Sequence, residues 1–177
     1  MAATHPLHGP VHHYGYVVDD LEKAIDHAIE TLGAGPFFRI DHVPLDSMKS
    51  DGAPATFDHS SAFGECGDTL LELMEIHTAE PAAVEEGFAL PRPQLHHIAF
   101  VVPSLEDGIE TLAQAGIPAY LEATLGAIHF TYHDGSGTFG HDVELHQDSP
   151  DFQGFWTNIR GSNAGWDGSD PVRSPFG

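Results

Sequence analysis

The sequence has a single cysteine, Cys66, and no long apolar segment. One cysteine cannot form a disulfide within the chain, and the run of about 20 apolar residues that a membrane-spanning helix needs is absent. The N-terminal residues also lack the basic-then-apolar order of a secretory signal peptide. These absences lead us to expect a cytoplasmic protein without a membrane anchor.

Basic residues are scarce as well. The chain has 6 Lys and Arg residues against 27 Asp and Glu residues, a formal net charge of −21 with histidine neutral. Such a charge repels nucleic-acid backbones and anionic membranes, so we expect neither as a partner. Histidine is plentiful by contrast, with 14 residues, and a subset of these can serve as metal ligands. The apolar content of 41% is typical of a folded globular protein.

An internal repeat organises the 177 residues. Residues 11–18 (VHHYGYVV) align without gaps with residues 95–102 (LHHIAFVV). Each copy continues into apolar residues at helical spacing that end at a glycine, Gly33 or Gly116, and each half then closes on a Glu-Leu strand. The repeat therefore predicts two copies of one strand–helix–strands module.

The repeat also sets the predicted boundaries. The extra length of the first copy falls in a stretch between Asp46 and Phe57, rich in Gly, Pro, Ser and Asp, which we expect to be irregular. Both tryptophans lie near the C-terminus, which favours a short helix over residues 152–160 and a tail that wraps around the protein. The predicted organisation is a first module at 1–77, a linker at 78–94, a second module at 95–148 and a tail at 149–177.

Strand alternation indicates which side chains can meet, because successive residues point to opposite faces. In the first repeated strand His13 shares a face with Gly15, and in its copy His97 shares the equivalent face with Ala99. We expect the small residue that follows each histidine on its face to leave room for a bound ligand.

The other face of each strand is bulkier and suits packing beneath a helix; it includes His12 and His96. In the closing strands, residues 69–76 and 141–147, the leucines form the core face, and Glu72 and Glu144 point the opposite way. Each module thus offers one histidine and one glutamate on a face outside the core.

Two imidazoles and two carboxylates suit one divalent ion of the Zn, Mn, Co, Ni or Fe type, rather than calcium or copper(I). Four protein ligands on a six-coordinate ion leave two positions for water or for two neighbouring substrate oxygens. A single His or Glu on a strand face more often has a structural role, but four residues related by a repeat favour a metal site. The predicted ligands are His13, Glu72, His97 and Glu144.

Several motifs resemble the vicinal oxygen chelate superfamily, which includes glyoxalase I, methylmalonyl-CoA epimerase, extradiol dioxygenases and bleomycin-resistance proteins. The similarity covers about residues 11–147, and the phrase GAGPF at 33–37 favours the epimerase-like or glyoxalase-like branch. The motifs are HYGYVVDDLEKAI at 13–25, LELME at 71–75, HHIAFVV at 96–102 and VEL at 143–145.

The resemblance implies an α+β fold in which two tandem βαβββ modules form a cupped mixed sheet around one metal ion. By position, His13, Glu72, His97 and Glu144 match the four ligand sites of the family, a set like that of bacterial glyoxalases. Epimerases often carry Gln where this chain has Glu72, which is a departure.

The resemblance also implies a divalent-metal-dependent enzyme of the epimerase, isomerase or glyoxalase-type lyase kind, acting by proton abstraction and a metal-stabilised enolate. Glu144 or Glu72 can serve as the base, and His129 and His133, on a predicted strand, are further catalytic candidates of which we expect one to face the site. His146 shares the face of Glu144 and is the better candidate for a supporting contact.

The segment in which epimerases carry their catalytic acid is rebuilt in this chain, so that residue cannot be assigned. Candidates for it are Asp41, His42, Asp46 and His59, for which structural roles are the simpler interpretation.

Two alternatives stay open. One is an Fe(II) extradiol-type dioxygenase, although its chemistry needs only two histidines and one carboxylate. The other is a metal-free protein that binds or sequesters an aromatic compound. The scarcity of Lys and Arg predicts a small-molecule substrate that is not a polyanion such as coenzyme A. We also expect a homodimer.

Overall fold

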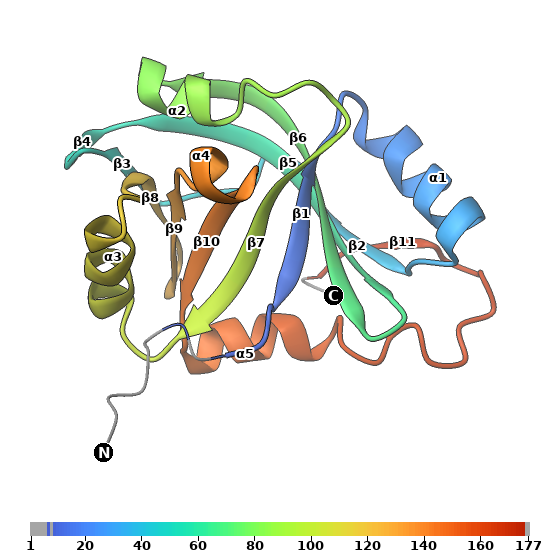
Figure 1. The fold of residues 1–177 in the computed structure, drawn as a ribbon. Coiled ribbons are helices and arrows are strands. Elements are labelled where there is room, and N and C mark those ends of the chain that lie inside the picture. Colours follow the sequence, from blue (N-terminus) through green and yellow to red (C-terminus); the bar gives the residue numbers. More distant parts are fainter. Residues whose placement is uncertain (1–6, 8, 176–177) are drawn as a thin grey trace.

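The two copies of the repeat form two βαβββ units that share one sheet (Figure 1). The computed structural model describes residue 7 and residues 9–175. Within this part the fold has eleven strands in one mixed sheet and five helices, which confirms the predicted α+β class. Among the residues that the structure describes, no helix is long and apolar enough to cross a bilayer.

Each unit contributes four strands and one long helix in the same order along the chain. The first unit comprises β1 (His13–Val17), α1 (Leu21–Leu32), β2 (Phe37–Ile40), β5 (Thr56–Cys66) and β6 (Thr69–Glu80). The second comprises β7 (Gln94–Val102), α3 (Leu105–Gln114), β8 (Ala119–Leu125), β9 (Ile128–His133) and β10 (Asp142–Gln147). The remaining elements are β3 (Ser47–Ser50), β4 (Ala53–Pro54), α2 (Ala82–Gly87), α4 (Ser136–Phe139), α5 (Pro150–Thr157) and β11 (Val172–Arg173).

The strands follow the order β11-β2-β5-β6-β1-β7-β10-β9-β8-β3-β4. Within each unit the first and last strands are parallel neighbours, β1 with β6 and β7 with β10. The two units join where β1 pairs antiparallel with β7. The strands that carry the repeated His and Glu residues therefore lie side by side at the middle of the sheet.

Local sequence signals explain where the two long helices begin and end. The Asp20 side chain accepts a hydrogen bond from the Lys23 backbone N–H at the start of α1, and Gly33 ends it in the left-handed conformation with φ 64°. Ser104 caps α3 in the same way, accepting from the Asp107 N–H. α1 buries its apolar side against the first unit and α3 buries Leu112 against the second, so both helices cover the outer faces of the sheet.

The stretch between Asp46 and Phe57 is not irregular, and that expectation is wrong. It contains the β3–β4 hairpin, whose turn residues Asp51 and Gly52 both have positive φ, 49° and 74°. A two-residue type I′ hairpin turn requires this conformation, and Asp-Gly is a favoured pair for it. β3 then pairs with β8 of the second unit, so the insertion fastens the two halves together.

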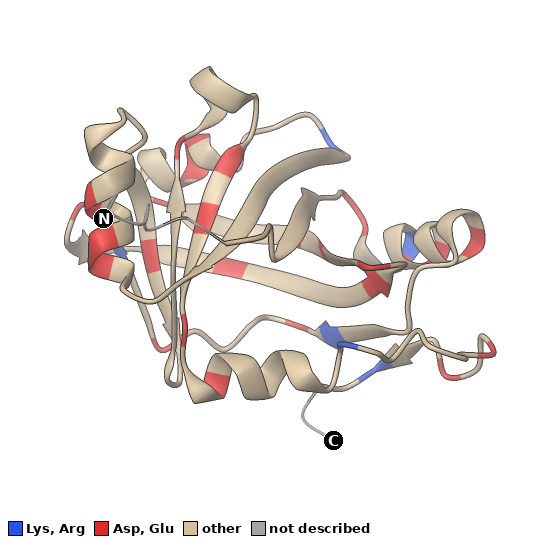
Figure 2. Ribbon diagram, turned by 60° about the horizontal axis from the view of Figure 1, so that its bottom comes forward, with Lys and Arg blue, Asp and Glu red and all other residues tan. Residues whose placement is uncertain are grey.

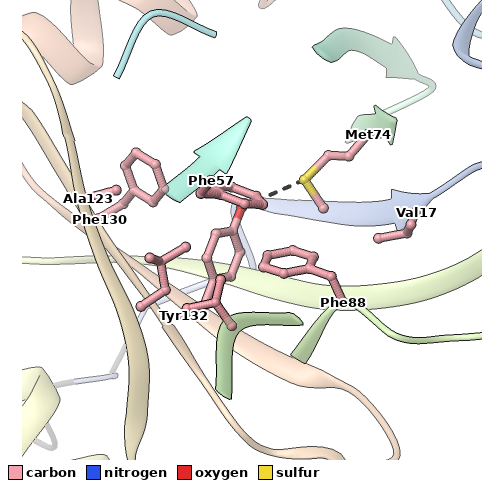
Figure 3. Packing of buried hydrophobic residues seen from close by; sticks show 9 residues of the cluster. Val17, Phe57, Met74, Phe88, Ala123, Phe130 and Tyr132 are labelled. Carbon is pink, nitrogen blue, oxygen red and sulfur yellow. Dashed lines mark hydrogen bonds between the residues drawn. The ribbon is translucent and has the colours of Figure 1, made fainter. Parts of the chain in front are cut away.

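Apolar side chains from both units fill the inside of the cup near α2 (Figure 3). Phe57 stacks on Phe88, the residue that follows α2. The Tyr132 hydroxyl donates a hydrogen bond to the Met74 sulfur at 3.7 Å. The opposite end of the cup is covered by α5, whose Phe152 and Trp156 are buried. The middle of the cup, between these two apolar clusters, is left for polar side chains.

Acidic residues are spread over strands, helices and loops, while basic residues are few (Figure 2). Lys23 pairs with Asp20 at 2.6 Å, and Arg39 pairs with Asp41 at 2.7 Å, both toward solvent. Their charge is thus partly neutralised by local partners at the surface.

Candidate metal centre

Four ionisable side chains meet in the middle of the cup: His13 from β1, Glu72 from β6, His97 from β7 and Glu144 from β10. Their four strands are consecutive in the sheet, and all four side chains are buried, with at most 4% of each residue exposed. The structure therefore brings together the four residues predicted from the repeat.

Strand register explains how the two halves converge. Gly15 of β1 lies beside Glu72 of β6, and Ala99 of β7 lies beside Glu144 of β10. Across the β1–β7 junction, His13 faces Ala99 and Gly15 faces His97. Each small residue therefore has the histidine of the other unit opposite it.

Gly15 makes room for an imidazole and not for the ligand that we expected there. A Cβ added at Gly15 would lie only 1.9 Å from Cε1 of His97. Gly15 is thus needed because the His97 ring occupies the space in which a larger side chain would stand.

The donor atoms are spaced as the ligands of one ion are. His13 Nε2 lies 3.0 Å from Glu144 Oε2 and 3.3 Å from Glu72 Oε2, and His97 Nε2 lies 3.3 Å and 3.4 Å from the same two oxygens. The two Nε2 atoms are 3.4 Å apart. Metal–ligand bonds of roughly 2.0–2.2 Å place neighbouring donor atoms about 3.0–3.6 Å apart. The four residues fit a small divalent ion.

Glu144 Oε2 gives a second sign of this fit. Three imidazole nitrogens surround it, from His13, His97 and His146, at 3.0 Å, 3.3 Å and 2.9 Å. Yet this buried oxygen has no hydrogen bond of acceptable geometry. A buried anionic oxygen without such a bond is costly, and a cation among the nitrogens would satisfy it.

The electrostatics of the four groups are strongly coupled. Burial alone would lower the pKa of His97, but the carboxylates of Glu144 and Glu72 outweigh it and raise this pKa to about 9. The pKa of His13 is raised for the same reason. Burial raises the pKa of Glu72 and Glu144, but neighbouring imidazoles outweigh it and hold both pKa values below the ordinary range. The carboxylates are therefore ionised and ready to bind a cation.

A second histidine backs each of the two in the centre, in both copies of the repeat. His12 Nδ1 lies 2.9 Å from His13 Nδ1, and His96 Nδ1 lies 3.0 Å from His97 Nδ1. Burial, the largest cause, lowers the pKa of His12 to about 2 and that of His96 to about 3, so both rings are neutral. A neutral ring can accept the Nδ1–H of its neighbour, which leaves the Nε2 lone pair of His13 or His97 directed to the centre.

This role for His12 and His96 was missed, because we expected both to pack under helices. The available signal was that the His-His pair occurs twice at the same place in the repeat. Glu72 has its own support, since the Ser61 hydroxyl donates to its Oε1 at 2.8 Å.

His129 and His133 do not reach the centre. His129 is exposed, and His133 is buried elsewhere, with Nε2 2.9 Å from the Thr131 hydroxyl and Nδ1 3.3 Å from the Ile117 carbonyl. The side chains of this strand alternate as predicted, but the face that carries the two histidines turns away from the centre. Its aromatic residues, Phe130 and Tyr132, line the cavity beside the centre instead.

Of the four candidates for a catalytic acid, three do not line the cavity. Asp41 pairs with Arg39, and His42 lies 2.8 Å from Asp58, both at the surface. Asp46 accepts a hydrogen bond from the Gly126 N–H at 2.6 Å. Only His59 of the four lines the cavity beside the centre. A second group of possible metal donors, His42, Asp58 and His77, is largely exposed.

The cavity has a volume of ≈ 60 Å³ and is closed on one side by α5. The ring of Trp156 stacks on His13, with ring centroids 5.1 Å apart and planes inclined by 27°. His146 also lines it, in contact with Glu144 as predicted. The centre thus borders a small space with mainly aromatic walls.

Replacing Gly15 by alanine should displace His97, because the added methyl group overlaps its ring. We expect Gly15→Ala to weaken Co²⁺ binding by about 10- to 100-fold, measured by isothermal titration calorimetry. Gly137→Ala is the control, since a Cβ there meets no atom within 4 Å. Equal affinities in the two variants would contradict the proposed closeness of Gly15 and His97.

Trp156 should report binding at the centre, because its ring stacks on His13. We expect Co²⁺ to quench the fluorescence of the wild-type protein and of Trp166→Phe, but to have little effect on Trp156→Phe. Trp166 lies at the far end of the tail, where its Nε1–H donates to the Ser169 carbonyl. Quenching that survives in Trp156→Phe would place the ion elsewhere.

Ion binding should also compete with protons. With its pKa raised to about 9, His97 is protonated at pH 7 in the ion-free protein and must lose that proton to bind a metal. The apparent affinity for Co²⁺ should therefore rise between pH 6 and pH 8, by about tenfold per pH unit for each displaced proton. Titrations in buffers of different ionisation enthalpy should show proton release; an affinity that is constant or falls with pH would refute this assignment.

Comparison with known proteins places this chain in a family. The chain matches the family model of the glyoxalase/bleomycin resistance protein/dioxygenase superfamily over residues 12–132. A methylmalonyl-CoA epimerase from Mycobacterium tuberculosis has a similar structure, with a TM-score of 0.55 and 18% identity, covering 86% of this chain and 95% of that chain. A hypothetical protein from Bacillus halodurans is similar at a TM-score of 0.53 and 18% identity, covering 79% and 94%.

At this identity the structural likeness concerns the fold alone, and no curated protein matches the chain significantly. The family match spans more than half of the chain, and the two βαβββ units in one sheet agree with it. The chain therefore belongs to the glyoxalase/bleomycin resistance protein/dioxygenase superfamily, the vicinal oxygen chelate superfamily that its motifs resemble.

Proposed function

We propose that this protein is a divalent-metal-dependent enzyme that binds a small molecule through adjacent oxygens and removes a proton from a neighbouring carbon. The observation that carries the proposal is the spacing of the four buried donor atoms, with measured separations of 3.0–3.4 Å. Structural likeness to an epimerase and membership of the superfamily support the same class of reaction.

The ligands in this proposal are His13, Glu72, His97 and Glu144, and the ion is Zn, Mn, Co, Ni or Fe. When bound, such an ion supplies Lewis-acid polarisation of substrate oxygens. His12 and His96 orient the two imidazoles, and the aromatic walls of the cavity keep water away from the reacting carbon.

Glu144 is a better base than Glu72 in this arrangement. The Ser61 hydroxyl holds Glu72 Oε1, whereas Glu144 Oε2 has no hydrogen bond of acceptable geometry and lies 2.9 Å from His146 Nε2. To act as the base, Glu144 Oε2 would have to be released from the ion; His146 Nε2, 2.9 Å away, is then the nitrogen next to the proton that this oxygen takes up. The proposal gives no catalytic role to His129 or His133.

Two other functions of the superfamily receive less support. An extradiol-type dioxygenase needs three open positions on its iron, and four protein donors converge here. A metal-free binding protein for aromatic compounds would suit the aromatic cavity, but it leaves the buried Glu144 oxygen without a hydrogen bond of acceptable geometry. Assembly as a homodimer stays a prediction.

The proposal is tested by metal analysis together with hydrogen–deuterium exchange. We expect the purified protein to bind one divalent ion per chain. With Co²⁺ in D₂O it should exchange the carbon-bound protons next to the carbonyl in at least one of a panel of α-hydroxyketones, followed by NMR. Glu144→Gln should lower the exchange rate by about 10²–10⁴-fold.

The matched controls are exposed residues of α1. Glu30→Gln removes a surface carboxylate and should exchange like the wild type, and His27→Ala serves the same purpose for His97→Ala. His97→Ala should lose both the ion and the exchange. A wild-type protein without bound metal, or exchange that persists in His97→Ala, would exclude this function.

A further inference from the structure

The wall of the cavity that faces away from the sheet is supplied by the C-terminal segment. Phe152, Phe155 and Trp156 of α5 all line the cavity, and α5 lies outside the residues that match the family. Phe155 meets Phe63 edge-on at 5.3 Å between ring centroids, so the helix closes onto the first unit of the sheet. Figure 1 shows α5 running below the ends of β1 and β7.

The chain fixes α5 at both ends. Ser149 caps its start by accepting from the Phe152 N–H at 3.1 Å. Beyond its end, the Glu65 carboxylate accepts from the N–H groups of Gly161 and Asn163, at 2.7 Å and 3.0 Å. β11 then joins the sheet beside β2. The aromatic wall is therefore a built part of the cavity.

The charges in the cavity set the kind of ligand it can hold. None of the described residues that line it is Lys or Arg. The two glutamates of the centre match the two charges of a divalent ion, so no positive charge is left for an anionic ligand. Its volume of ≈ 60 Å³ is far below the roughly 300–1,000 Å³ typical of sites for larger ligands, and below the roughly 150 Å³ of a closed cavity that holds benzene. An aromatic ring can therefore enter only when the half-buried side chain of Phe155 moves outward.

His59 of β5 supplies a polar group on the sheet side of the same cavity. It is 3% exposed, stacks on Phe57, and its Nδ1 has no hydrogen-bond partner. His59 lines the cavity, so a buried nitrogen without a partner there can take a hydrogen bond from a polar group of a ligand.

We propose that the cavity takes a small uncharged compound with an aromatic ring, which lies against Phe152, Phe155 and Trp156 while a polar substituent reaches His59. This inference rests on the proposed function, in which adjacent oxygens of the substrate face the metal centre. It names the substrate class of the same site: a compact aromatic α-oxygenated ketone or a close equivalent, and not an acyl-coenzyme A.

The test uses the full chain loaded with Co²⁺ and four probes in calorimetry, two neutral and two charged. The neutral probes are 2-hydroxy-1-phenylethanone and hydroxyacetone, which replaces the ring by a methyl group. The charged probes are 4-(2-hydroxyacetyl)benzoate, which adds a carboxylate to the ring, and propionyl-CoA. We expect the phenyl ketone to bind at least about tenfold more tightly than hydroxyacetone, and the benzoate and propionyl-CoA to bind far more weakly than the phenyl ketone.

Phe155→Ala should reduce the preference for the ring several-fold while leaving Co²⁺ affinity unchanged, because Phe152 and Trp156 still line the cavity, and Phe155→Leu should reduce it less. Phe139→Ala, which removes an exposed phenylalanine of α4, is the matched control. Equal binding of the phenyl ketone and hydroxyacetone, or a ring preference as large in Phe155→Ala as in Phe139→Ala, would overturn this inference and leave the proposed function standing. Failure of the wild-type chain to bind Co²⁺ would overturn both.

Discussion

The rest of the structure depends on one electrostatic constraint, the burial of two carboxylates and two imidazoles at the junction of β1 and β7. Buried charges are costly unless they are paired and hydrogen-bonded, and Glu144 Oε2 lacks a hydrogen bond here. The surroundings reduce this cost where they can: His12 and His96 back the imidazoles, and Ser61 holds Glu72. What they leave is the space and charge that a divalent cation fits.

Duplication solves the problem of aiming four side chains at one point. Each unit has a parallel pair of strands that presents one histidine and one glutamate, and the antiparallel β1–β7 junction turns the two sets toward each other. Gly15 is the residue that makes this junction possible, because the ring of His97 lies where its side chain would be. The chemistry of the centre is therefore tied to the register of one strand pair.

The four residues of the centre could be predicted because they depend on two local regularities, the repeat and the alternation of strands. The faces of His129 and His133 could not, because alternation shows which residues share a face but not which face turns inward. The pairing of β3 with β8 and the closing of the cavity by α5 join segments far apart in sequence. Such contacts depend on packing, for which the local pattern carries little information.

The central claim is that the atoms His13 Nε2, Glu72 Oε2, His97 Nε2 and Glu144 Oε2 hold one divalent ion. A crystal structure of the protein purified with Co²⁺, with data collected on both sides of the cobalt absorption edge, tests it most directly. The account predicts one strong anomalous peak at about 2.0–2.2 Å from all four atoms. A map without a peak among them, or with the cobalt bound only at the surface, would contradict it.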